Sequence, residues 1–168
     1  MKRSNPLRSG ISAAALCALA LGLVARPASA TTVTTTFAVT ATVQSTCLVS
    51  ATAMAFGTYT GALATSTSTV SVTCSNTTPY NIGLSAGLAT SATVTTRAMT
   101  GPGAATLTYG LFQDSGHSTN WGQTVSTDTV AGTGNGAAQA ITVYGQAAAG
   151  QYVAPGSYAD TITATITY

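Results

Sequence analysis

Charged side chains are scarce in this sequence, and most of the basic ones lie near its start. Five residues are basic and three are acidic out of 168, which is 5% of the chain, against about 25% in an ordinary soluble domain. Four of the basic residues come first: Lys2, Arg3, Arg8 and Arg26. Beyond them the chain has Arg97, three aspartates and no lysine. Nucleic-acid patches and polybasic membrane surfaces need clustered Lys and Arg, so both are excluded, and no nucleic-acid partner is expected.

Residues that carry chemistry are also few. The sequence has no glutamate and a single histidine, His117. A hydrolase needs a base beside its nucleophile, and a glycosidase needs two carboxylates at one bond, for which Asp114 and Asp128 are the candidate pair. The glycine-rich stretch 132–136 lacks the lysine of a phosphate loop, and the scattered aspartates do not form a calcium loop. We therefore expect no enzyme, no cofactor and no metal, and a hydrolase built on His117 is the least favoured alternative.

The first 30 residues are typical of a secretory signal peptide. A basic start leads into an apolar run over 11–24, shorter than the roughly 20 residues of a membrane helix. The small residues Ala28 and Ala30 fit cleavage after Ala30. No later apolar stretch is long enough to span a membrane. We expect export to the periplasm and then the cell surface, with residues 31–168 as one domain.

Two cysteines, Cys47 and Cys74, follow the predicted signal peptide. An exported chain enters an oxidising compartment, so the pair is predicted to form a disulfide. In the chain-entropy model, closing a loop of about 28 residues stabilises the fold by roughly 3–4 kcal/mol. The alternative, a metal or redox site, needs closer spacing or histidine partners, and His117 is the only histidine.

Alternation of apolar and polar residues is the dominant pattern. Along 31–43, one face carries Val33, Thr35, Phe37, Val39, Ala41 and Val43. Along 158–168, one face carries Tyr158, Asp160, Ile162, Ala164, Ile166 and Tyr168. Further strands are predicted over 47–56, 66–74, 80–84, 94–99, 106–112, 123–130 and 140–144, separated by turn residues. Threonine is abundant and helix formers are rare, so we predict an all-β immunoglobulin-like sandwich.

The two long alternating segments, 31–43 and 158–168, lack the lysine and proline that commonly protect strands against pairing. Exposed edge strands are normally blunted by lysine, proline or inward-pointing charges. Neither segment contains lysine or proline. One interpretation is that both pair within the domain, and the other is that they pair with another chain by strand addition.

Trp121 and the surrounding aromatic residues admit two interpretations. They line a ligand pocket in a monomeric carbohydrate-binding module, or they form the hydrophobic core and its rim. Large aromatic side chains usually belong to the core, and we favour that interpretation.

Several stretches together resemble the spore coat protein U (SCPU) domain family. The resemblance rests on these segments, which occur in the expected order: 37–43 followed by Cys47, 56–59, 70–75 ahead of Tyr80, 97–99, 107–114, 121–122, 143–145 and 156–168. It spans essentially all of 31–168. The family includes Csu-type pilus subunits of the archaic chaperone–usher pathway and a coat protein of bacterial spores.

The resemblance implies an incomplete immunoglobulin-like β-sandwich, completed by donor-strand complementation. A periplasmic chaperone lends the missing strand, and at the outer-membrane usher the N-terminal strand of the next subunit replaces it. Residues 31–43 are then the donor strand, with Val33, Phe37, Val39, Ala41 and Val43 facing the groove. The C-terminal strand, which the chaperone also contacts, lines the acceptor groove with these side chains: Tyr158, Ile162, Ala164, Ile166 and Tyr168. The Cys47–Cys74 bridge ties the start of the domain to its core.

The resemblance favours a secreted structural subunit of a surface pilus or fimbria that serves adhesion or biofilm formation. Its partners are copies of itself or related subunits, the chaperone and the usher. A spore or cell coat protein is the alternative, followed by the carbohydrate-binding module.

Overall fold

The computed structural model describes residues 28–168, so the predicted signal peptide over 1–30 lies almost wholly outside the described residues. The elements in chain order are β1 (Cys47–Ala51), β2 (Ala64–Cys74), β3 (Pro79–Leu84), β4 (Arg97–Thr100), the short 3₁₀ helix η1 (Pro102–Ala104), β5 (Thr106–Phe112), β6 (Val130–Thr133), β7 (Ala138–Ala147) and β8 (Ala164–Thr167). The all-β prediction is confirmed.

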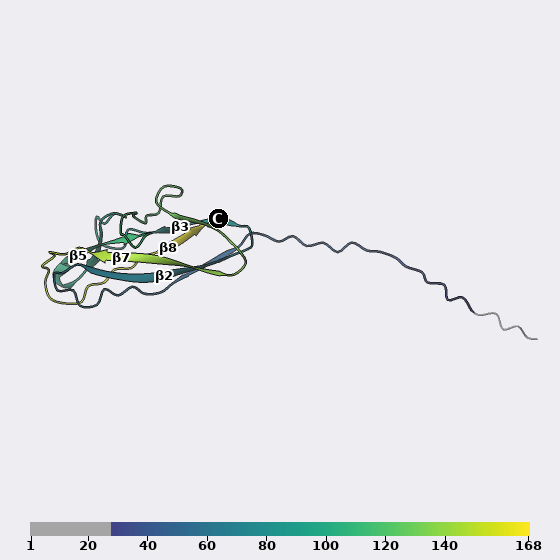
Figure 1. Ribbon diagram of the computed structural model, residues 1–168, viewed down its shortest axis with the longest axis horizontal. Helices are drawn as coiled ribbons and strands as arrows, with labels where there is room; N and C mark the ends of the chain where they lie inside the picture. The colour runs from purple at the N-terminus through teal and green to yellow at the C-terminus, as the bar shows by residue number, and fades with distance from the viewer. Residues whose placement is uncertain (1–27) are drawn as a thin grey trace, which may run out of the picture. The chain divides into compact units, whose positions relative to one another are not determined.

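The strands form two antiparallel sheets that face each other (Figure 1). One sheet has the order β1-β2-β7-β5-β4, and the other has the order β6-β3-β8. The longest ladder joins β2 to β7, from Ala64 opposite Ala147 to Thr73 opposite Ala138. β1 and β8 each lie at an edge of their sheet and approach each other.

The core lies between the sheets and takes side chains from both. Its buried members are Val70, Val72, Cys74, Tyr80, Ile82, Leu84, Tyr109, Leu111, Trp121, Val143 and Ala147. In β2 the inward side chains are every second residue from Ser68 to Cys74, as a strand with one buried face requires. Trp121 is fully buried, and its indole N–H donates to the main-chain oxygen of Ile82.

The predicted disulfide between Cys47 and Cys74 is present. The two residues lie opposite each other where β1 pairs with β2. Beside the bridge, Thr46 precedes Cys47 and Ser75 follows Cys74. The main-chain N–H of Thr46 donates to the hydroxyl of Ser75, and the N–H of Ser75 donates to the main-chain oxygen of Thr46. The start of the domain is therefore fastened to β2 by a covalent bond and hydrogen bonds together.

The strand predicted over 123–130 is wrong. Turns occupy most of this stretch, because the N–H groups of Thr127 and Asp128 donate to the main-chain oxygen of Thr124, and the Asp128 carboxylate accepts the N–H of Thr124. β6 begins at Val130 and runs into the glycine-rich stretch 132–136. The local hydrogen bonds of an aspartate thus outweigh a weak alternating pattern.

Two other predicted strands are shorter in the structure. The stretch 47–56 is a strand only to Ala51, and 158–168 is a strand only from Ala164 to Thr167. The alternation of side chains nevertheless continues through 158–163, where even-numbered residues are half-buried and odd-numbered ones are exposed. The inward-facing set of this segment was therefore predicted correctly, although its ladder is shorter.

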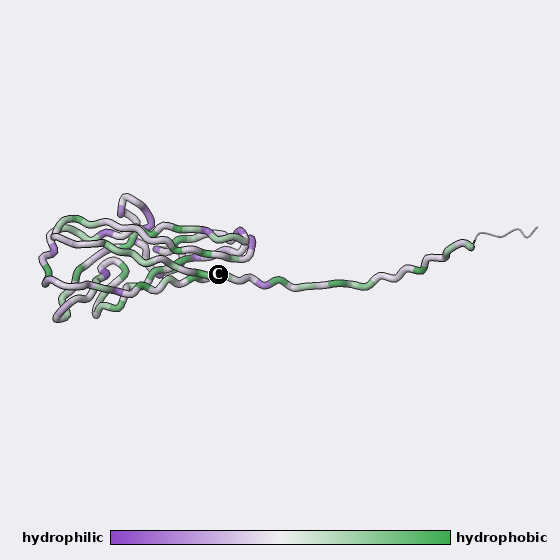
Figure 2. Tube along the Cα trace, turned by 90° about the horizontal axis from the view of Figure 1, so that it is seen from below, coloured by the Kyte–Doolittle hydropathy of each residue, from purple (hydrophilic) through white to green (hydrophobic). Residues whose placement is uncertain are grey.

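Residues 28–40 belong to a unit separate from 41–168, and each unit is described by itself. No strand is present from 28 to 46. The large apolar side chains of the predicted strand 31–43 are exposed: Val33 by 93%, Phe37 by 84%, Val39 by 83% and Val43 by 88%. Apolar residues recur along this segment in Figure 2. The alternating pattern is thus present without the hydrogen-bonded neighbour that would make it a strand.

Within residues 28–168, none of the helical structure has the length and apolar character required to cross a lipid bilayer.

Candidate functional site

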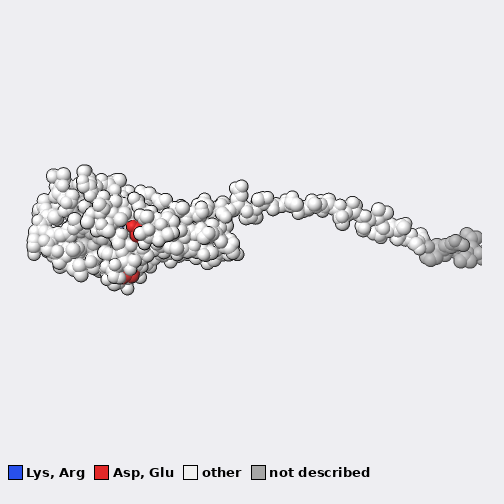
Figure 3. Space-filling model, turned by 90° about the horizontal axis from the view of Figure 1, so that it is seen from above, with Lys and Arg blue, Asp and Glu red and all other residues white. Residues whose placement is uncertain are grey.

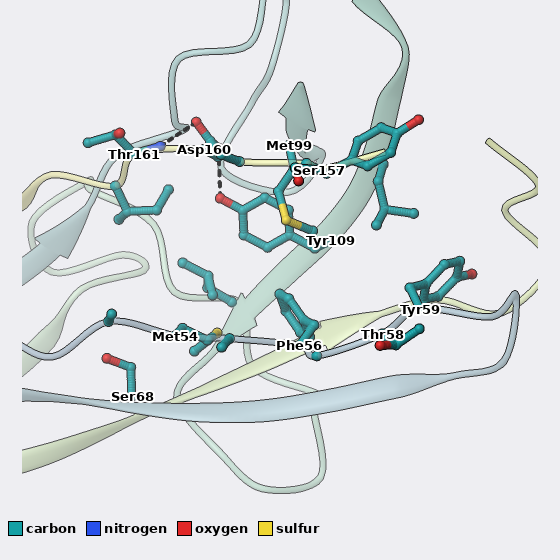
Figure 4. A pocket seen from close by; sticks show the side chains of 18 of the residues that line it. Met54, Phe56, Thr58, Tyr59, Ser68, Met99, Tyr109, Ser157, Asp160 and Thr161 are labelled. Atoms are coloured by element: carbon teal, nitrogen blue, oxygen red, sulfur yellow. Dashed lines mark hydrogen bonds between the residues drawn. The ribbon is translucent and has the colours of Figure 1, made fainter. Parts of the chain in front are cut away.

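A groove of about 1080 Å³ opens between two segments of the domain that follow β1 and precede β8. One rim is the stretch 51–61, and the other is the stretch 151–164. The two rims face each other across the sandwich in Figure 4. We call this feature the groove, and the two segments the first rim and the second rim.

The floor of the groove consists of core side chains from both sheets. These are Ser68, Val70, Leu84, Met99, Leu107, Tyr109, Leu111 and Val143. All but one of them are apolar or aromatic. In a complete sandwich such side chains are covered by a further strand or by the opposite sheet. Here they lie beneath an open groove, although all but Met99 are at most 8% exposed, and the groove therefore resembles a hydrophobic core with one strand missing.

Apolar side chains also line the rims. Met54 and Phe56 project from the first rim toward the floor, where the rings of Phe56 and Tyr109 meet edge to face with centroids 6.0 Å apart. Gly145 in β7 provides the room for Met54, because a Cβ at this position would overlap the sulfur atom. Ile162 lies on the second rim. Both walls can thus contact an apolar side chain placed between them.

Between Tyr158 and Thr163, the main chain of the second rim is bonded on one side only. Ala159 exchanges two hydrogen bonds with Thr100, and Thr163 bonds with Ser85 through its main-chain oxygen and its N–H. Successive main-chain groups of an extended segment point to opposite edges. The N–H and C=O groups of the even-numbered residues between Tyr158 and Ile162 accordingly point the other way, and they make no hydrogen bonds within residues 28–168. This rim therefore presents an unpaired strand edge along the groove.

The groove is open to solvent, so water fills its volume of about 1080 Å³ in the isolated chain. Replacing that water by apolar side chains would be strongly favourable.

Charged groups cluster beneath the second rim. The guanidinium of Arg97 is fully buried and donates to four main-chain oxygens, which belong to Leu84, Ser85, Val94 and Trp121. Burial lowers the pKa of Arg97 from its usual value. Asp160 of the second rim accepts a hydrogen bond from the hydroxyl of Tyr109 at 2.7 Å. Burial, and then this hydrogen bond, raise the pKa of Tyr109 far above its usual value, so the hydroxyl remains a donor at physiological pH.

The exterior of the domain has no positive charge to attract an anionic partner. Arg97 is the sole Lys or Arg among residues 28–168, and it is buried. The face seen in Figure 3 shows aspartate as its only charged residue type. The groove therefore presents apolar side chains and main-chain groups, with no exposed basic side chain.

The C-terminal residues predicted to line an acceptor groove divide into two groups. Tyr158, Ile162 and Ala164 lie on its second rim. Ile166 lies opposite Ile82 in the ladder of β8 with β3, and Tyr168 is 58% exposed; neither lines the groove. The first rim, Arg97 and Asp160 were not predicted as site residues. Two signals were available in the sequence: Asp160 shares a face with the predicted set, and residues 56–59 of the first rim belong to the segments that carry the family resemblance.

The candidate catalytic and sugar-binding residues form no site. His117 packs edge-on against Phe112 and Tyr144, at centroid distances of 5.3 and 6.4 Å. The Asp114 carboxylate accepts the N–H groups of Ser118 and Thr119 within its own turn. Asp128 is likewise occupied by its loop, and within residues 28–168 no three potential ligands gather as a metal site. Because Trp121 is buried, its interpretation as a core residue is confirmed, and it offers no surface to a sugar ring.

Known proteins were compared with the chain at the levels of sequence and structure. A search of the curated proteins found no match. Among solved structures, the chain resembles one from the crystal structure of a CsuC–CsuE chaperone–tip adhesion subunit pre-assembly complex, from archaic chaperone–usher Csu pili of Acinetobacter baumannii. The TM-score is 0.57 at 24% sequence identity, over 76% of this chain and 40% of that one, so the likeness concerns the fold.

The family comparison covers most of the chain. The model of the Spore Coat Protein U (SCPU) domain matches residues 33–165. This range includes both rims of the groove and most of the alternating segment 31–43. The chain therefore belongs to the Spore Coat Protein U domain family.

Proposed function

We propose that this protein is a structural subunit of a surface pilus or fimbria, assembled by a chaperone–usher pathway through donor-strand exchange. The observation that carries the proposal is the groove, an apolar core with an unpaired strand edge along its second rim. The same chain supplies a matching occupant in residues 31–43, whose apolar side chains are exposed and whose main chain has no strand partner. Inserted in the groove of a second copy, this segment acts as the missing strand.

Length and pattern favour residues 31–43 as the occupant. At about 3.3 Å per residue, an extended segment of this length spans about 43 Å. The rims of the groove are stretches of similar length, 51–61 and 151–164. Every second side chain of the donor segment faces one way, so Val33, Phe37, Val39, Ala41 and Val43 point into the groove together with Thr35. The opposite face consists of threonines and Ala38.

The energetics favour a stable assembly. Burying a large apolar side chain contributes about 1.5–3 kcal/mol, so four of them contribute about 6–12 kcal/mol. Hydrogen bonds to the even-numbered main-chain groups of the second rim add about 0.5–1.5 kcal/mol each. The donor segment also displaces the water that fills the groove. No catalytic group or cofactor is needed for such an assembly.

The partners follow from the exposed groove. A chain with an uncovered apolar groove is prone to aggregate, so a periplasmic chaperone that lends a strand is expected to hold it after export. The likeness to a chain of a chaperone–subunit complex supports this expectation. An outer-membrane usher then exchanges the lent strand for residues 31–43 of the next copy or of a related subunit. The finished fibre lies at the cell surface and serves adhesion or biofilm formation.

Deleting residues 31–43 tests the proposal. The shortened subunit should still bind its chaperone, because the groove is intact, and it should form no fibre, because it cannot fill a neighbouring groove. Electron microscopy of cells that express chaperone, usher and subunit measures the outcome. Persistent fibres, or a shortened chain that stays a stable monomer without its chaperone, would contradict donor-strand exchange.

A spore or cell coat protein is the second candidate, because the matching family model is named for a spore coat protein. Both candidates use the same groove and the same donor segment. They differ in the machinery: a pilus subunit requires an usher, and its gene is expected beside chaperone and usher genes. Surface assembly that continues in a strain without the usher would favour the coat.

A further inference from the structure

The second rim of the groove changes its sheet partner along its length. At Ala159 it is bonded to Thr100 at the end of β4, in the five-stranded sheet. At Thr163 it is bonded to Ser85, directly after β3 in the three-stranded sheet. Between these points lies Thr161, whose N–H points to the same side as those of Ala159 and Thr163. Neither sheet supplies a main-chain acceptor for this N–H.

The side chain of Asp160 takes the place of that acceptor. Its Oδ1 atom accepts the N–H of Thr161 at 2.8 Å and the N–H of Leu88 at 2.7 Å. Its Oδ2 atom accepts the hydroxyl of Tyr109 at 2.7 Å. One carboxylate thus joins the rim to β5 and to the loop after β3, in the place where the ladder is interrupted. Figure 4 shows Asp160 between Thr161 and Tyr109, at the upper wall of the groove.

The surroundings of Asp160 are specific for a carboxylate. Gly87 has φ +91°, and a Cβ there would overlap the carboxylate. The buried Arg97 guanidinium is the positive group near Tyr109 and Asp160, and Asp128 is the other acidic group that acts on Arg97. Arg97 also lies opposite Tyr109 in the ladder of β4 with β5. A neutral side chain at residue 160 would remove one of the two nearby negative charges that favour the buried cation.

We propose that Asp160 is a positioning residue for strand capture: it keeps the second rim extended across the gap between the sheets, so that the even-numbered main-chain groups face the incoming strand. This inference rests on the proposed function. A rim that is already extended loses less conformational entropy when a strand pairs with it. Asp160 therefore accelerates capture of the donor segment, in addition to any contribution to the stability of the domain.

The test measures capture of a synthetic peptide of residues 31–43 by the full exported chain. The protein is dilute, the fluorescently labelled peptide is in excess, and anisotropy gives the association rate. The variants are Asp160→Asn, Asp160→Ala and Tyr109→Phe, which removes the hydroxyl while keeping the ring in the floor. Asp114→Asn is the matched control, because it removes the same charge from a turn whose carboxylate bonds only within that turn.

We expect association about tenfold slower for Asp160→Asn, slower still for Asp160→Ala and about threefold slower for Tyr109→Phe, with the control within twofold of wild type. Hydrogen exchange at the N–H groups of Thr161 and Leu88 should accelerate in the Asp160 variants. If the role of Asp160 were purely structural, its substitution would lower the free energy of unfolding without changing the association rate of the folded chain.

Two results separate this inference from the function on which it rests. Wild-type protein that captures the peptide, with folded Asp160 variants that capture it equally fast, overturns the role of Asp160 and leaves the proposed function standing. Wild-type protein that does not bind the peptide overturns both. If the Asp160 variants do not fold, Tyr109→Phe decides: slower capture supports the inference, and an unchanged rate overturns it.

Discussion

Phe37 is expected to be the strongest single contributor of the donor segment. Its ring is 84% exposed within residues 28–168, so Phe37→Ala removes no packing that the described chain shows. In the groove of a second copy the ring becomes buried, which is worth about 1.5–3 kcal/mol, and its loss leaves a cavity that raises the cost to about 3–5 kcal/mol. At about 1.4 kcal/mol per factor of ten, a loss of 3 kcal/mol corresponds to an affinity about 100-fold weaker.

The assay compares 31–43 peptides in competition for the groove. A labelled wild-type peptide is displaced by unlabelled wild type, Phe37→Ala and Thr36→Ala, and the loss should appear mainly as faster dissociation. Thr36 lies next to Phe37 on the opposite face of the segment, so Thr36→Ala should change the affinity less than twofold. Equal effects of the two substitutions would refute the assignment of the faces, and with it the reasoning from alternation.

Three further predictions concern the domain itself. Replacing both Cys47 and Cys74 by alanine should lower the free energy of unfolding by roughly 3–4 kcal/mol in denaturant titrations, because the loop between two residues 27 positions apart is no longer closed. Arg97→Ala should cost about 3–5 kcal/mol by the same measurement, since buried main-chain oxygens lose their donors, and Arg97→Lys should not restore stability because an ammonium lacks the planar array of donors. Hydrogen bonds from the N–H groups of Thr119 and Ser118 lower the pKa of Asp114 to about 2. The stabilisation from Asp114 should therefore be present above pH 4 and be lost as the pH falls through 2, and an NMR titration of its carboxyl should show that midpoint.

The alternating pattern predicted the parts of the fold that depend on which side of a strand a residue faces. In 158–163 the inward side chains were predicted correctly even though the ladder is interrupted, because the period of two belongs to any extended segment with one buried side. The disulfide followed from export and from the presence of two cysteines after the signal peptide. The strand over 123–130 failed because Asp128 and Thr124 satisfy their hydrogen bonds locally.

The hydrogen-bonding arrangement of Asp160 and Arg97 beneath the groove could not be predicted from the sequence. The role of Asp160 arises because Ser85 and Thr100, far apart in the chain, approach the same rim and leave a gap between them. Arg97 could be identified as the one basic residue of 31–168, but not as buried, since its acceptors are main-chain oxygens that have no signature in the sequence. Residues 51–56 of the first rim were predicted as strand. Beyond Ala51, the hydroxyls of Ser68 and Ser66 donate to the main-chain oxygens of Thr52 and Ala55, which the alternating pattern does not reveal.

The central claim is that the groove takes one strand with the alternating pattern of residues 31–43. Native mass spectrometry of the chain lacking 31–43, refolded with a synthetic peptide, tests it directly. We predict a 1:1 complex with the 31–43 peptide, and none with a peptide of the same composition in which the apolar and threonine faces are exchanged. Equal binding of both peptides, or binding of neither, would contradict the account.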